Sequence, residues 1–145
     1  MKVVVLFESL TGNTRRASEL IGGALQAQGA EVTVRPIDAF DYHEVSVADI
    51  VVIGTWVDGF IVAGHRPGRA GKLRKLPVLD RKKVAAFVTY AIRPGKALAK
   101  TAAVLEGRGA DVVARAQLRR DRLEQDMQPF VAEITRVAGG AKAAK

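Results

Sequence analysis

Residues 3–14 read VVVLFESLTGNT, an uninterrupted apolar run followed by a short turn rich in hydroxyl side chains. The run Val3–Phe7 is typical of a strand buried on both faces of a parallel sheet, because such strands do not alternate apolar and polar residues. From Asn13 to Gln28 apolar residues recur at helical spacing, and Gly29 supplies a stop. A strand, a turn and a helix therefore follow one another at the start of the chain.

The same order of strand and helix recurs along the rest of the sequence. Further strands are expected at Glu31–Pro36, Asp49–Gly54, Lys83–Thr89 and Asp111–Leu118, the last as an edge strand. Helices are expected from Pro67 (with Leu73 and Leu76), at Gly95–Arg108 and at Asp121–Ala138, where Pro129 should introduce a kink. Five strands alternating with helices predict an α/β fold, a doubly wound five-stranded parallel sheet with helices on both faces. We expect one domain, residues 1–138, and a flexible tail, residues 139–145.

Composition excludes several classes of chemistry. The 145 residues include no cysteine, so the chain has no disulfide, thiol nucleophile or cysteine-ligated metal. The two histidines, His43 and His65, lack the close spacing of a metal-binding pair, and we expect no metal site. No apolar stretch approaches the length of a membrane span, so we expect a cytoplasmic protein.

Charge is unevenly distributed within the net +8. Residues 1–63 carry a net −4, residues 64–83 a net +7 and residues 84–145 a net +5. The basic part of the chain should raise encounter rates with acidic partners. A solvated basic face without a dedicated partner is the alternative.

The turn after the first strand has the features of a phosphate site. Backbone N–H groups at a helix N-terminus carry the positive end of the helix dipole and hold a phosphate without a formal positive charge. The hydroxyl groups of Ser9, Thr11 and Thr14 add donors, and Gly12 lets the main chain wrap closely. Simple helix capping by Asn13 or Thr11 is the alternative. In doubly wound sheets ligands bind at the carboxyl ends of the strands, where the strand order reverses.

The pattern Ser9-x-Thr11-Gly12-x-Thr14 after a buried strand resembles the phosphate-loop signature of the flavodoxins, T/S-x-T-G-x-T. Chain length, the alternation of strands and helices, and the loops after Ile53 and Val88 extend the resemblance over nearly the whole chain. It implies the strand order 2-1-3-4-5, with FMN at the switch point between strands one and three. It also implies an electron carrier or, if the protein is an enzyme, an FMN-dependent oxidoreductase.

Each loop of the implied FMN site contributes its own residues. The phosphate loop comprises Ser9, Leu10, Thr11, Gly12, Asn13 and Thr14. The second loop contains Thr55, Trp56, Val57, Asp58 and Gly59, where Trp56 would stack on one flavin face and Gly59 would allow a peptide flip toward flavin N5. The third contains Thr89, Tyr90 and Ala91, with Tyr90 as candidate for the opposite face. Nearby cations, Arg93 among them, should stabilise the anionic reduced flavin and make its potential less negative than in acidic flavodoxins.

Competing patterns fit the residues less well. The first strand is not followed by G-x-G-x-x-G, and no Walker loop is present. A receiver domain needs a second acidic residue where Gly54-Thr55-Trp56 stands. Two other functions stay open: an FMN-dependent NAD(P)H:quinone-type oxidoreductase, and a flavodoxin-like scaffold that binds partners without flavin. Redox proteins of acidic character are the expected partners. Nucleic acid is not expected, since the basic stretch Arg66–Lys83 lacks interleaved aromatic residues.

Overall fold

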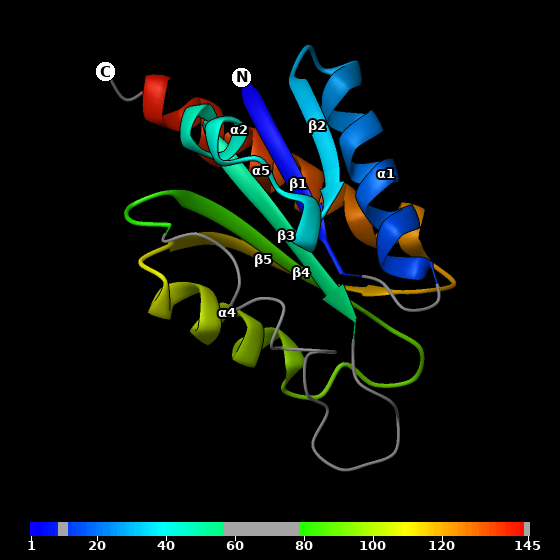
Figure 1. The fold of residues 1–145 in the computed structure, drawn as a ribbon. Coiled ribbons are helices and arrows are strands. Elements are labelled where there is room, and N and C mark those ends of the chain that lie inside the picture. The colour runs from blue at the N-terminus through cyan, green and yellow to red at the C-terminus, as the bar shows by residue number, and fades with distance from the viewer. Residues whose placement is uncertain (9–11, 57–78, 144–145) are drawn as a thin grey trace.

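The computed structural model describes residues 1–8, 12–56 and 79–143 (Figure 1). Its elements are β1 (Lys2–Phe7), α1 (Asn13–Ala27), β2 (Glu31–Pro36), the 3-10 turn η1 (Ile37–Ala39), α2 (Tyr42–Val47), β3 (Ile50–Trp56), β4 (Lys83–Tyr90), α4 (Ala97–Gly107), β5 (Asp111–Arg119) and α5 (Leu123–Ala143). The helix expected from Pro67, with Leu73 and Leu76, lies outside the described residues.

The five strands form one parallel sheet in the order β2-β1-β3-β4-β5. This confirms the predicted fold class and strand order. Strand β1 lies between β2 and β3, with Val3 opposite Val32 on one side and Ile50 on the other. Strand β5 is an edge strand, as its alternating Arg115 and Gln117 predict.

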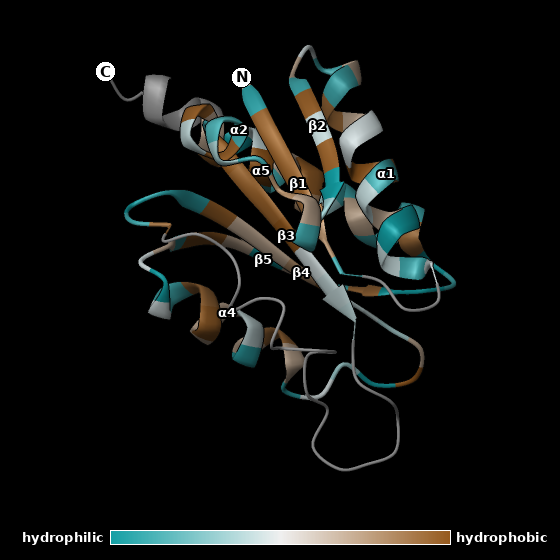
Figure 2. Cartoon of the chain, in the orientation of Figure 1, coloured by the Kyte–Doolittle hydropathy of each residue, from teal (hydrophilic) through white to brown (hydrophobic). Residues whose placement is uncertain are grey.

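Helices cover both faces of the sheet (Figure 1). Successive side chains of a strand point to opposite faces, so each central strand contributes to two cores. Val3 and Val5 of β1 belong to the core that includes residues of α1 and α5, whereas Val4 and Leu6 belong to the core that includes residues of α2 and α4. The central strands are accordingly apolar along most of their length (Figure 2). The continuous run Val3–Phe7 is therefore explained by burial on both faces.

Two strands extend farther toward the carboxyl edge of the sheet than the sequence predicts. Strand β3 continues beyond Gly54 through Thr55 and Trp56, which pair with Val88 and Thr89 of β4. Strand β4 itself continues to Tyr90. The ladder between neighbouring strands, rather than local apolar character, sets these ends, so Thr55 and Trp56 lie in a strand and not in a loop.

The helices also differ from expectation at some boundaries. Helix α5 includes Pro129 and continues to Ala143, past the predicted end at Ala138. The residues after the two glycines are Ala and Lys, both good helix formers, and no proline follows. Helix α2 was not predicted. It is only six residues long, and its start is capped by Asp41, whose Oδ1 accepts a hydrogen bond from the Glu44 N–H at 3.0 Å.

Candidate functional site

The carboxyl ends of β1, β3 and β4 meet at one edge of the sheet. Strands β1 and β3 are neighbours although β2 separates them in the sequence, so the strand order reverses between them. The Glu8 N–H donates to the Gly54 carbonyl at 3.0 Å, which extends the β1–β3 ladder one residue past the end of β1. This is the switch point at which doubly wound sheets bind their ligands.

Helix α1 starts at this switch point without a side-chain cap. Its N-cap is Gly12, in a left-handed conformation with φ of 92°, and the Arg16 N–H donates to the Gly12 carbonyl at 2.9 Å. Nothing lies within 4 Å of where a Cβ would stand at Gly12, so the glycine is needed for its backbone angle rather than for space. Asn13 is the first helical residue, and the alternative of capping by Asn13 is therefore wrong.

The first turn of α1 favours an anion electrostatically. It contains no acidic residue, and it includes the exposed Arg15 and Arg16. Their ion pairs are loose and exposed, Arg15 with Glu19 at 3.8 Å and Arg16 with Glu124 at 3.7 Å. Surface pairs of this kind hold a side chain weakly. The positive end of the helix dipole is thus reinforced by two cations.

A buried hydrogen bond joins this helix to the end of β4. The Oγ1 atoms of Thr14 and Thr89 lie 2.8 Å apart, and both residues are buried. A hydroxyl group has one proton and two lone pairs, so Thr14 can donate to a ligand only while Thr89 donates to Thr14. Two predicted site residues from different loops are thereby brought into direct contact.

The end of β3 carries the predicted stacking residue. Thr55 is buried, and Trp56 is half-buried opposite Thr89 of β4. The indole Nε1 of Trp56 is buried and has no hydrogen-bond partner among the described residues. A buried donor without an acceptor costs about 1–3 kcal/mol, which a ligand acceptor would recover.

The end of β4 carries Tyr90, the residue predicted to cover the opposite flavin face. Tyr90 is half-buried, and its carbonyl accepts a hydrogen bond from the Arg120 N–H at 2.9 Å. Alternation along β4 puts Tyr90 on the opposite face of the sheet from Thr89. Ala91 follows in the loop and is half-buried. The described residues show no ring contact between Tyr90 and Trp56.

Of the predicted site residues, the structure describes Gly12, Asn13, Thr14, Thr55, Trp56, Thr89, Tyr90 and Ala91. The remaining predicted site residues, Ser9, Leu10, Thr11, Val57, Asp58 and Gly59, lie outside the described residues. The second loop's peptide flip at Gly59 therefore stays a prediction.

One buried residue at this edge was not predicted to belong to the site. Glu8 is only 4% exposed, directly before the predicted phosphate loop. The sequence did contain a sign of this burial. Alternate residues of a strand lie on the same face of the sheet, and Glu8 continues the series of the buried Val4 and Leu6.

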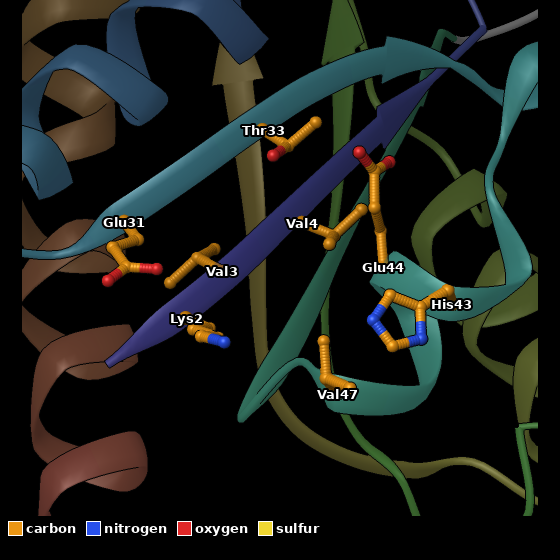
Figure 3. Close-up of a pocket in the computed structure, with 8 residues that line it drawn as sticks. All are labelled: Lys2, Val3, Val4, Glu31, Thr33, His43, Glu44 and Val47. Carbon is orange, nitrogen blue, oxygen red and sulfur yellow. The ribbon is translucent and has the colours of Figure 1, made fainter.

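A cavity of about 210 Å³ lies at the opposite, amino end of the sheet (Figure 3). It is lined by Lys2, Val3, Val4, Glu31, Thr33, His43, Glu44 and Val47. Its charges are mixed, and Glu44 already binds Arg35 through two hydrogen bonds of 2.6 and 2.7 Å. The cavity is therefore separate from the candidate site.

Residues 1–8, 12–56 and 79–143 bring together no group of three His, Cys, Asp or Glu side chains suited to a metal ion. None of the helices in these ranges has the length and apolar character required to cross a bilayer.

The fold and the helix start at its switch point define the flavodoxin-like class of α/β proteins. A family model described as a flavodoxin domain matches residues 4–108. The chain therefore belongs to the flavodoxin family. The search of curated proteins finds no match.

Solved structures share this fold at low sequence identity. The two-electron-reduced flavodoxin of Megasphaera elsdenii has a TM-score of 0.74 and 24% identity, over 95% of this chain and 98% of that one. Oxidised flavodoxin 1 of Bacillus cereus has a TM-score of 0.68 and 23% identity, over 94% and 98%. The rubredoxin oxygen:oxidoreductase of Desulfovibrio gigas has a TM-score of 0.72 and 23% identity, over 99% of this chain but 37% of that one.

Proposed function

We propose that the chain binds FMN at the carboxyl edge of β1, β3 and β4 and transfers electrons between proteins. The observation that carries this proposal is the start of α1, where a glycine cap, a first turn without acidic residues and two arginines coincide at the switch point. When bound, FMN supplies the redox chemistry, accepting and releasing electrons singly or in pairs.

The residues of this chain would bind and orient the cofactor. The phosphate would be held by Ser9, Leu10, Thr11, Gly12, Asn13 and Thr14, through backbone N–H groups and hydroxyls. The ring would lie between two groups of residues, one at and after the end of β3 and the other at and after the end of β4. The first group is Thr55, Trp56, Val57, Asp58 and Gly59, and the second is Thr89, Tyr90 and Ala91. The buried Nε1 of Trp56 is consistent with a ligand at this edge, since it has no acceptor among the described residues. No side chain is needed as an acid or base.

A reductive titration tests electron transfer. We expect purified protein to be yellow, to release FMN on denaturation, and to take up two electrons in steps that an added redox protein can reverse. Protein that is colourless and does not quench the fluorescence of added FMN would instead support the scaffold without flavin.

A second candidate function is an FMN-dependent NAD(P)H:quinone-type oxidoreductase. The cationic third-loop region favours it, because Arg93 and Lys96 are exposed and form no ion pair within the described residues, leaving them available to nicotinamide phosphates. Steady-state oxidation of NADH or NADPH with a quinone separates the two functions. An electron carrier turns over neither nucleotide at an appreciable rate.

Partner proteins of acidic character follow from the net charge of +8. Opposite charge on a partner speeds diffusional encounter, and this effect weakens as salt screens it.

A further inference from the structure

An exposed apolar side chain stands directly beside the candidate site. Ile92 is 65% exposed, two residues after Tyr90 at the end of β4. A single exposed isoleucine is ordinary on a protein surface. Here, however, exposed cations follow Ile92 in the chain, at Arg93 and Lys96.

The chain between Asp80 and Glu106, which spans β4 and most of α4, carries only one sign of charge. It contains six Lys or Arg side chains and no Asp or Glu. Two of these cations form hydrogen bonds to backbone carbonyls at the amino end of the sheet. Lys82 Nζ donates to the carbonyls of Ser46 and Ala48 at 3.0 Å, and Lys83 Nζ donates to the Val137 carbonyl at 3.2 Å. Arg93 and Lys96, by contrast, lie in the loop that follows the carboxyl end of β4.

A third cation reaches the same edge from β5. The Arg120 N–H donates to the Tyr90 carbonyl at 2.9 Å, which fixes the turn after β5 against the end of β4. Arg93, Lys96 and Arg120 are all exposed, and none forms an ion pair within the described residues. Arg119, which precedes Arg120 in the chain, does form an ion pair, with Asp121 at 3.0 Å. Three cations without an ion pair among the described residues therefore lie at the same edge of the sheet as Ile92.

We infer that Ile92, Arg93, Lys96 and Arg120 form a docking surface for an acidic electron-transfer protein. This inference rests on the proposed function and specifies where the partner binds. The cations steer an anionic partner toward this edge, and the apolar centre excludes water from the contact once it forms. A protein docked here lies beside Thr89, Tyr90 and Ala91, the residues at the end of β4 that are proposed to hold the flavin.

Two probe proteins of opposite charge test whether this surface prefers an acidic partner. Native cytochrome c is basic, and its lysine-succinylated form is acidic with the same haem. Reduced holoprotein is mixed with each form in a stopped-flow instrument at low and high ionic strength. We expect the acidic form to be reduced at least about tenfold faster at low salt, with the difference shrinking as salt rises.

Charge-reversal variants locate the effect. The Arg93→Glu/Arg120→Glu variant should lose the preference for the acidic form. The Lys2→Glu/Arg108→Glu variant changes net charge equally but at the amino edge, and it should keep most of the preference. Ile92→Ser should slow reduction of the acidic form without changing its salt dependence. Binding of succinylated cytochrome c to each variant, measured by calorimetry at low salt, gives a readout that does not require electron transfer.

Several outcomes would overturn the inference. These are faster reduction of the basic form, equal losses in the two double variants, or tighter binding of single-stranded DNA than of the acidic protein at this edge. Holoprotein that contains FMN but shows any of these results contradicts the docking surface alone. Protein that binds no FMN contradicts the proposed function, and with it the redox character of the partner.

Discussion

The hydroxyl pair Thr14–Thr89 links two parts of the site that are 75 residues apart in sequence. Replacing one hydroxyl by a methyl group leaves the other buried without its partner, which costs about 1–3 kcal/mol. Replacing both removes the polar groups together and is less damaging.

We therefore predict that Thr14→Val and Thr89→Val each lower the unfolding free energy of the FMN-free protein, by about 1–2 kcal/mol. The double variant should lose clearly less than the sum, and urea unfolding of all four proteins measures this coupling. Additive losses would show that the two hydroxyls do not depend on each other.

Gly54 allows the Phe87 ring to pack closely against the backbone of β3. A Cβ at this position would stand 2.1 Å from the Phe87 Cζ, and the Phe87 ring is held edge-on against Phe130 at 5.8 Å between centroids. Since Phe87 is fully buried, its ring has no open space to move into.

Gly54→Ala should lower the unfolding free energy by about 2 kcal/mol or more, through overpacking. Gly23→Ala is the matched control, because Gly23 is exposed within α1 and nothing lies within 4 Å of the place that its new methyl group would occupy. It should stabilise the protein by up to about 1 kcal/mol through helix propensity. Thermal unfolding of both variants measures these opposite changes in stability. Equal changes in the two variants would contradict the overpacking of Phe87.

At the scale of elements, helix α2 is held to strand β2 by one charged pair. Arg35 of β2 donates two hydrogen bonds to Glu44 of α2, at 2.6 and 2.7 Å. These hydrogen bonds lower the pKa of the Glu44 carboxyl from its ordinary value of 4.5. A carboxyl with a lowered folded-state pKa contributes stability above its unfolded pKa and loses it as pH falls through the folded value.

Glu44→Gln should therefore lower the melting temperature at neutral pH and have less effect under acidic conditions. We expect the difference between wild type and variant to be largest above about pH 4.5 and to shrink progressively below it. Both groups are partly exposed, so the effect is modest. A difference that is constant from pH 7 to pH 3 would show that ionisation of Glu44 has no part in it.

The sequence predicted most elements because their signals are local. The run Val3–Phe7 and the helical spacing after Asn13 are visible within a few residues, and the strand order followed from the resemblance around Ser9-x-Thr11-Gly12-x-Thr14. The end of β3 was missed because a contact distant in sequence determines it, the pairing of Trp56 with Thr89. Helix α2 was missed because it has only six residues, too few for apolar residues to recur at helical spacing.

For the candidate site too, the sequence predicted the local features and missed the contacts between distant residues. Its residue types and their order along the chain are local information, so Gly12, Trp56 and Tyr90 were placed at the carboxyl edge. The Thr14–Thr89 bond was not foreseen, since neither residue's neighbours indicate the other. Burial of Glu8 was not foreseen either, because a charged residue ordinarily marks the end of an apolar run.

At the scale of the whole molecule, positive charge should act on the potential of the bound flavin. Arg93 is exposed and near the third-loop residues, where the reduced flavin would carry negative charge. We predict that Arg93→Glu makes the second reduction step more negative. Reversing one charge about 10 Å away in water changes the energy by roughly 0.8 kcal/mol, or about 35 mV. Reductive titration against a reference dye measures the shift, with Lys2→Glu as control, and an unchanged potential would contradict the prediction.

The central claim is that this edge of the sheet holds FMN by its phosphate. The most direct measurement is a fluorescence titration of FMN and of riboflavin, which lacks the phosphate, with flavin-free protein. We predict one-to-one quenching of FMN and binding at least about tenfold weaker for riboflavin, because the start of α1 contributes only to the phosphorylated ligand. Unquenched FMN, or equal affinity for the two flavins, would contradict the claim.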